Sequence, residues 1–227
     1  SSDLCSSDLL VILFLAISAS FNPGNQAAKY IVNEQVLSHF FPSAPLSIIL
    51  IDAFRSGFVI KTYYQKYKLV NPFRPPETVV VKTTKRYWNK NRSNLGMCLF
   101  HRAEDGSETT TVTPPGINFV GDPAYGQWNY LPSGEKIWEF HRAYREFPEI
   151  LGWGDFRPDL QFYEQSKNYL TLERPYYGPD KQFGSNGSVT RKYLLPEVNI
   201  GKKQKKNISF HLSRILFYPK INSADPK

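Results

Sequence analysis

The chain has 227 residues, of which 41% are hydrophobic and 15% aromatic, and it carries a formal net charge of +8. This length suffices for one domain with a core, or for a smaller domain with appendages, and two cysteines exclude a disulfide-rich scaffold. The positive charge is uneven, because residues 174–227 hold 11 Lys and Arg against 3 Asp and Glu, whereas residues 21–173 are nearly neutral.

The first residues, Ser1–Leu9, repeat the letters SSDL around Cys5. This stretch resembles the translation of a sequencing adapter, so we set it apart from the fold as an artefact. Residues 10–20 are mostly apolar and place small side chains at Ser18 and Ser20, the two positions that a signal peptidase reads. The run is shorter than a membrane span and typical of a secretory leader. We therefore expect a signal peptide, or the remnant of a membrane anchor.

Residues 22–70 are predicted to be helical. A weak helix candidate ends before Pro42, and Ser43 is a candidate N-cap for a second helix. From Leu46 onward apolar residues recur three and four positions apart, which predicts an amphipathic helix that continues into KTYYQKYK, Lys61–Lys68. Either this helix packs on the domain, or its Lys and Tyr side chains lie at a membrane interface.

The segment NPFRPPE, Asn71–Glu77, contains three prolines and predicts a linker. Residues 77–173 then predict an aromatic-rich domain that begins with a strand at Thr78–Trp88. Two hairpins are expected: GMCLFHR and SETTTVT flank an Asp-Gly turn, and QWNYL and EKIWEF flank the turn PSG.

Helix signals follow the hairpins. The letters IWEFHRAYREFPEIL predict a helix interrupted at Pro148, and Pro158 and Asp159 are expected to begin a further helix, DLQFYEQSKNYLTLE. The stretch INFVG is expected to be a short strand. Strands followed by helices, without alternation, predict an α+β fold in which β-hairpins pack on helices. Residues 174–227, with the charge run Lys202–Lys206, are expected to form a partly disordered basic tail.

Three motifs lie between Pro114 and Lys192. They are G-x-P-x-Y-G-x-W at Gly121–Trp128, W-x-F-x-x-x-Y at Trp138–Tyr144, and a Tyr-Tyr-Gly sequence followed by GSNGSVTR, at Tyr176–Arg191. Together they resemble a group of uncharacterised bacterial envelope-associated proteins. The resemblance implies a bacterial origin and an export or anchor segment, and it implies no activity. The chain departs from the group in its last residues, where KKQKKNISFHLSRILFYPK replaces a Gly/Ser-rich end.

Catalytic signals are weak. The chain contains no H-E-x-x-H, C-x-x-C, G-x-S-x-G or P-loop pattern. Glu139 and His141 are the candidates for a hydrolase that acts on cell-wall material. Cys98 with His101 or His141 as base is a second possibility, but a cysteine in the apolar stretch GMCLF is expected to be buried and inert. We predict no cofactor and no metal site.

Aromatic residues beside Gly and Pro are the candidates for binding, because exposed rings stack on sugars and enrich interfaces. They are Tyr125, Tyr130, Trp153, Tyr176 and Tyr177. By contrast, Trp128, Trp138 and Phe140 are expected in the core.

The second candidate surface is basic, and it would attract anionic lipid headgroups, cell-wall polymers or another envelope protein. Its residues are Arg191, Lys192, Lys202, Lys203, Lys205 and Lys206. No motif for specific nucleic-acid binding accompanies them. The sequence therefore predicts a non-enzymatic envelope protein, exported to the periplasm or membrane-associated, that interacts through an aromatic rim and a basic tail. The alternative is a cell-wall-directed hydrolase that uses Glu139 and His141.

Overall fold

A computed structural model describes residues 29–57 and 60–194. The expectations for Ser1–Leu9, for the leader at residues 10–20 and for Lys202–Lys206 lie outside these ranges. Within them, the helices and strands in chain order are β1 (Tyr30–Ile31), α2 (Gln35–Phe40), β2 (Leu46–Ser56), β3 (Thr62–Asn71), β4 (Arg74–Thr83), α3 (Lys85–Asn91), β5 (Cys98–Arg102), β6 (Glu108–Thr109), β7 (Gly126–Tyr130), β8 (Lys136–Phe140), α4 (Phe147–Ile150) and α5 (Leu160–Thr171).

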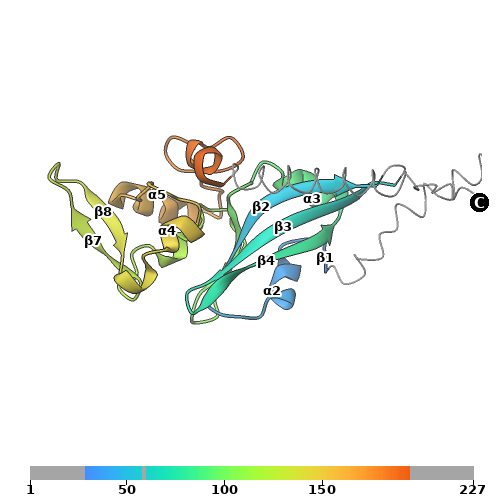
Figure 1. Ribbon diagram of the computed structural model, residues 1–227, viewed down its shortest axis with the longest axis horizontal. Coiled ribbons are helices and arrows are strands. Elements are labelled where there is room, and N and C mark those ends of the chain that lie inside the picture. The colour runs from blue at the N-terminus through green and yellow to red at the C-terminus, as the bar shows by residue number, and fades with distance from the viewer. Residues whose placement is uncertain (1–28, 58–59, 195–227) are drawn as a thin grey trace, which may run out of the picture.

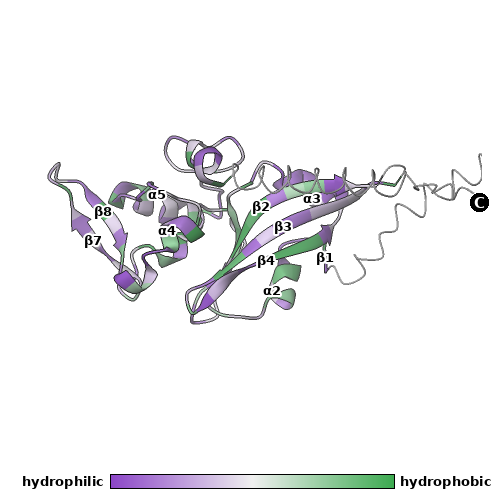
Figure 2. Cartoon of the chain, viewed as in Figure 1, coloured by the Kyte–Doolittle hydropathy of each residue, from purple (hydrophilic) through white to green (hydrophobic). Residues whose placement is uncertain are grey.

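The larger sheet has six strands in the order β1-β4-β3-β2-β5-β6, and all neighbours are antiparallel except β1 and β4. Strands β2, β3 and β4 are long and curve together at one end of the molecule (Figure 1). Helix α3 packs against β3, where Tyr87 lies beside Tyr67. Figure 2 shows apolar residues along β2 and on α2, where Leu37 is fully buried.

The hairpin β7–β8 lies at the other end of the molecule, next to α4 and α5 (Figure 1). The backbone of Trp138 donates a 2.8 Å hydrogen bond to the Pro158 carbonyl oxygen, which ties β8 to the start of α5. The Asp159 carboxylate accepts a 2.6 Å hydrogen bond from the backbone N–H of Phe162 and so caps α5. The helix start predicted at Asp159 and both hairpin predictions are confirmed, as is the α+β class. The N-cap predicted at Ser43 is wrong, because strand β2 follows it.

The helix predicted from Leu46 is wrong, because these residues form β2. Strand β2 lies between β3 and β5, and residues 46–52 are buried on both of its faces. A strand with two buried faces shows no alternation, and its apolar run also fits a helical pattern. The residues TYYQKYK of the next segment form most of β3, so the prediction of a helix at a membrane interface is also wrong.

The predicted linker at Asn71–Glu77 is the turn between β3 and β4 and the start of β4. Asn71 pairs with Arg74 across this turn, and its side-chain amide donates to the Pro45 carbonyl oxygen at 2.8 Å. The register of β3 and β4 shifts at Pro75 and Pro76, and neither proline is paired with a residue of β3. On the other edge of β4, β1 pairs only with Lys82 and Thr83. The sheet therefore continues across the expected domain boundary at residue 77.

Three smaller expectations also fail. The strand predicted to Trp88 ends at Thr83, because the Thr84 hydroxyl accepts from Tyr87 N and caps α3. The letters INFVG form a 3-10 turn entered through Gly116 in the left-handed conformation. The helix predicted from Ile137 begins as strand β8, because pairing with β7 fixes these residues in the hairpin.

The low-order tail predicted from Arg174 is wrong for residues 174–194, which pack on the body of the protein. Tyr176, Phe183, Val189 and Leu194 are buried. They are separated by loop residues, so the segment has no periodic pattern, yet each apolar side chain reaches the core. Residues 190–194 close this segment with a π-helical turn.

A partly buried histidine makes stability depend on pH. Burial lowers the pKa of His101, on β5, to about 4 from its ordinary value of 6.5. The unfolded chain binds this proton below about pH 6.5, whereas the folded chain stays neutral down to about pH 4. The contribution of neutral His101 to the free energy of unfolding is therefore fully present above pH 6.5. It is lost as the pH falls toward 4, at up to about 1.4 kcal/mol per pH unit.

We expect His101→Leu to reduce this loss. Urea denaturation at a series of pH values should show a steeper fall in the unfolding free energy for the wild type than for the variant. Parallel curves between neutral pH and the folded-state pKa would contradict the prediction.

Candidate functional site

Glu139 and His141 do not form an acid–base pair. The Glu139 carboxylate accepts a hydrogen bond from the Asn129 side-chain amide across the hairpin. The imidazole Nε2 of His141 lies 3.0 Å from the carbonyl oxygen of Pro123. Both side chains are exposed. Within the described residues, neither bonds to the other or to a second carboxylate, as a hydrolase requires.

Cys98 is a free, fully buried thiol, as predicted from its apolar surroundings. Burial raises its pKa to about 11, and its Sγ lies 3.1 Å from the Phe100 carbonyl oxygen. A thiol with this pKa is protonated at neutral pH and is a poor nucleophile. The arrangement gives Cys98 a packing role in the sheet.

Three of the five predicted binding aromatics are buried, so the expected aromatic rim is incomplete. Tyr125, Trp153 and Tyr176 are 2%, 1% and 3% exposed. Trp153 donates from Nε1 to the Pro115 carbonyl oxygen at 2.9 Å, and Tyr176 packs edge-on against Phe162. Neighbouring Gly and Pro residues bend the backbone, and here the bends direct these rings inward.

The other two binding candidates reach the surface. Tyr130 is 70% exposed at the end of β7, and the Lys136 ammonium lies 4.9 Å from its ring centroid. Tyr177 is half-buried. Among the rings assigned to the core, Trp138 is buried, while Trp128 and Phe140 are partly buried against it.

Two members of the predicted basic surface lie in the described residues. The Arg191 guanidinium donates a 3.1 Å hydrogen bond to Asn186 Oδ1. The Lys192 ammonium lies 3.3 Å from Asp155 Oδ2, in an exposed ion pair that contributes little to stability. Lys192 is therefore partly neutralised, and Arg191 is the more available cation.

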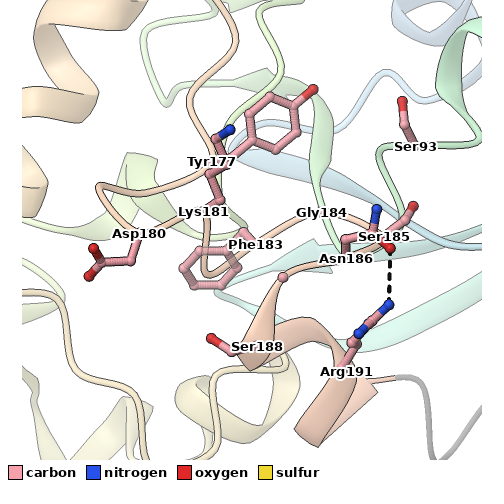
Figure 3. A pocket seen from close by; sticks show the side chains of 11 residues that line it. Ser93, Tyr177, Asp180, Lys181, Phe183, Gly184, Ser185, Asn186, Ser188 and Arg191 are labelled. Atoms are coloured by element: carbon pink, nitrogen blue, oxygen red, sulfur yellow. Dashed lines mark hydrogen bonds between the residues drawn. The ribbon is translucent and has the colours of Figure 1, made fainter.

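A cleft of about 590 Å³ opens beside Tyr177, between the loop after α3 and the segment 177–191 (Figure 3). We call it the Tyr177 cleft, and its lining residues are Ser93, Tyr177, Asp180, Lys181, Phe183, Gly184, Ser185, Asn186, Gly187, Ser188 and Arg191. Its volume is within the range typical of small-molecule sites.

Hydrogen bonds between the two loops fix the walls of the Tyr177 cleft. The Ser185 hydroxyl donates to the Arg92 carbonyl oxygen at 2.8 Å and accepts from the Leu95 N–H at 3.2 Å. The Ser185 N–H donates to the Ser93 carbonyl oxygen at 3.0 Å. The Tyr177 hydroxyl donates to Asn94 Oδ1 at 2.9 Å. These hydrogen bonds hold the walls of the cleft in place, which lowers the entropic cost of binding.

Two glycines give the cleft its shape. Gly184 has a φ of +87°, and a Cβ there would lie 2.9 Å from the Tyr177 ring. A Cβ on Gly187 would lie 2.2 Å from the Gln182 carbonyl oxygen. Any larger residue at either position would displace a wall of the cleft.

The cleft carries a positive charge. Lys181 and Arg191 line it, against one carboxylate, Asp180, which lies 3.3 Å from the Gln182 amide nitrogen. Figure 3 shows Lys181 beside Tyr177 and Arg191 next to Asn186, on different sides of the cleft. Within the described part of the chain, the Lys181 ammonium has no acceptor. It can therefore bind an external anion.

A second cavity of about 560 Å³ shares Tyr177 and Lys181 with the cleft. We call it the Tyr169 pocket, and its lining is Gln165, Tyr169, Pro175, Tyr176, Tyr177, Gly178, Pro179 and Lys181. Tyr169 is 39% exposed, and its ring centroid lies 5.0 Å from that of Tyr176. This pocket is walled by rings, whereas the Tyr177 cleft is rich in hydroxyl, amide and cationic groups.

Sequence reasoning found Tyr177 and Arg191 but missed Lys181, Ser93 and Ser188. The available signal was the Tyr-Tyr-Gly and GSNGSVTR motif, which supplies seven of the lining residues of the Tyr177 cleft. Its glycines and serines are typical of a disordered tail, so the sequence alone does not place the motif at a site.

Within residues 29–57 and 60–194, no group of three or more His, Cys, Asp and Glu side chains is arranged to hold a metal ion. In the same ranges, no helix combines the length and apolar character needed to cross a membrane. Comparisons of the chain with models of protein families, with curated proteins and with solved structures returned no match.

Proposed function

We propose that this chain is a non-enzymatic protein of the bacterial cell envelope, exported or membrane-tethered, that binds acidic cell-wall polymers through the Tyr177 cleft. The observation that carries the proposal is the cleft itself, whose walls are cross-linked by hydrogen bonds and which presents Lys181 and Arg191. A fixed, cationic cleft with an aromatic wall suits recognition of a sugar-based polyanion.

The placement in the envelope is supported by the sequence alone. Residues 10–20 have the character of a secretory leader, and the motifs between Pro114 and Lys192 resemble envelope-associated proteins. The basic excess of residues 174–227 gives the chain a long-range attraction to acidic polymers.

The hydrolase alternative is less well supported. Glu139 and His141 are exposed on a hairpin and hydrogen-bond to separate groups, so neither has the environment that tunes a catalytic pKa. The aromatic residues nearby, Trp138 and Phe140, contact each other and other rings of the core.

Co-sedimentation with purified bacterial cell walls tests the proposal. We expect binding that weakens with added salt, no release of soluble sugar fragments, and unchanged binding for Glu139→Gln and His141→Gln. Fragment release that Glu139→Gln abolishes would establish the hydrolase instead. Binding to vesicles of anionic phospholipid, without binding to walls, would assign the chain to a lipid surface and overturn the proposal.

A further inference from the structure

The two cavities meet at one short segment. Tyr177 and Lys181 line both of them. Of the residues between these two, Gly178 and Pro179 line the Tyr169 pocket, and Asp180 lines the Tyr177 cleft. A ligand longer than a single ring can therefore contact both cavities across this segment. Lys181, which has no acceptor among the described residues, stands at the junction.

The Tyr169 pocket suits a sugar ring. Tyr169 and Tyr177 line it together with Pro175 and Pro179, so rings supply part of its walls, beside the polar groups of Gln165 and Lys181. The C–H face of a pyranose packs against such walls, while its hydroxyl groups need hydrogen bonds at the edge. Gln165 provides one partner, because its Oε1 accepts from the Tyr176 hydroxyl at 3.0 Å and this orients its amide N–H groups.

The Tyr177 cleft suits an acidic group and further hydroxyl groups. Ser93 and Ser188 present hydroxyls, and Arg191 keeps donors beyond the one bonded to Asn186. A guanidinium and an ammonium on different sides of the cleft favour more than one negative charge on the same ligand (Figure 3). An inorganic anion would use the cations but would leave the aromatic walls without a partner.

We propose that the Tyr169 pocket and the Tyr177 cleft are adjoining subsites for one acidic saccharide chain, with Lys181 binding its carboxylate at the junction. The inference rests on the proposed function and specifies its ligand class. One sugar ring packs against Tyr169, and the next acidic unit enters the Tyr177 cleft toward Arg191.

Calorimetric titration of the full chain with a short oligogalacturonate tests the inference. The matched probe is the same oligosaccharide with its carboxyl groups methyl-esterified, and inorganic polyphosphate supplies charge without sugar rings. We expect the acid form to bind about tenfold more tightly than the ester, and more tightly than polyphosphate.

Two variants address the two subsites. Lys181→Gln and Tyr169→Ala should each weaken oligogalacturonate binding about tenfold. Both side chains are at the surface, so the fold should persist, which circular dichroism checks. Lys85→Gln removes the same charge from an exposed position on α3 and should leave affinity unchanged.

Failure of this inference is distinguishable from failure of the proposed function. Binding to cell walls, with equal affinity for the acid and the ester or no effect of Lys181→Gln, would overturn the saccharide assignment alone. Tighter binding of polyphosphate would also overturn it, in favour of a site that recognises only charge. Loss of binding to cell walls and to the oligosaccharide would overturn both.

Discussion

Replacing Trp153 with alanine is expected to lower the free energy of unfolding by about 3–5 kcal/mol. Trp153 is 1% exposed, and its ring centroid lies 5.5 Å from that of Phe140 and 6.2 Å from that of Phe156. The substitution removes this large apolar surface and leaves a cavity between α4 and the hairpin. It also removes the donor that satisfies the Pro115 carbonyl oxygen at 2.9 Å.

Urea denaturation followed by circular dichroism measures this change. Phe73→Ala is the control, because Phe73 is 64% exposed in the turn between β3 and β4 and buries little surface. We expect the control to change stability by less than about 0.5 kcal/mol. A loss of less than about 1 kcal/mol for Trp153→Ala would show that this ring is not a central part of the core.

Replacing Arg102 with alanine is expected to cost about 3 kcal/mol, because its guanidinium joins two elements that are distant in sequence. Nη1 donates to the Phe41 and Ser43 carbonyl oxygens at 2.7 and 2.8 Å, after α2. Nη2 donates to the Ser38 carbonyl oxygen at 3.1 Å and to Glu108 Oε1, on β6, at 2.6 Å. Removal leaves these acceptors without their charged partner.

The variant Arg102→Lys tests whether the positive charge at this position is enough, or whether the shape of the guanidinium is also needed. Lysine keeps the charge but lacks the planar, forked guanidinium. We therefore expect Arg102→Lys to lower the free energy of unfolding by most of the amount that Arg102→Ala does. The control is Lys90→Ala. The exposed Lys90 ammonium lies 2.7 Å from Glu34 Oε1 in an ion pair, and its removal should lower the free energy of unfolding by less than about 1 kcal/mol. Equal effects of Arg102→Ala and Lys90→Ala on the urea midpoint would contradict this account.

Local signals in the sequence predicted local structure correctly. The Asp-Gly turn before Ser107, the Pro-Ser-Gly turn at Gly134 and the helix start at Asp159 each depend on a few neighbouring residues, and each forms as expected. These features depend on backbone conformation and on hydrogen bonds between neighbouring residues, so the residue types at these positions are enough to predict them.

The burial of β2 could not be inferred in the same way. Ile48, Ile49, Leu50 and Ile51 are buried because β3 and β5 flank the strand and other parts of the chain cover both faces. The spacing of apolar residues within the strand does not distinguish this arrangement from an apolar helix. The β-branched side chains were the one signal that favoured a strand.

The candidate site depended still more on long-range contacts. Ser93 and Ser185 are 92 positions apart, and a backbone hydrogen bond between them closes the Tyr177 cleft. Exposure of the tyrosines was also a long-range property, because Tyr176 is buried while Tyr177, its neighbour, lines the cleft. The motif at Tyr176–Arg191 indicated the right region without indicating its shape.

The central claim is that the chain recognises an acidic polymer at the Tyr177 cleft and does not cleave it. Amide hydrogen exchange of the full chain, with and without oligogalacturonate, tests this claim most directly. The account predicts slower exchange in residues 177–191 and around Ser93, with the oligosaccharide recovered intact. Slower exchange confined to the β7–β8 hairpin near Glu139 and His141, with a shortened oligosaccharide, would contradict it.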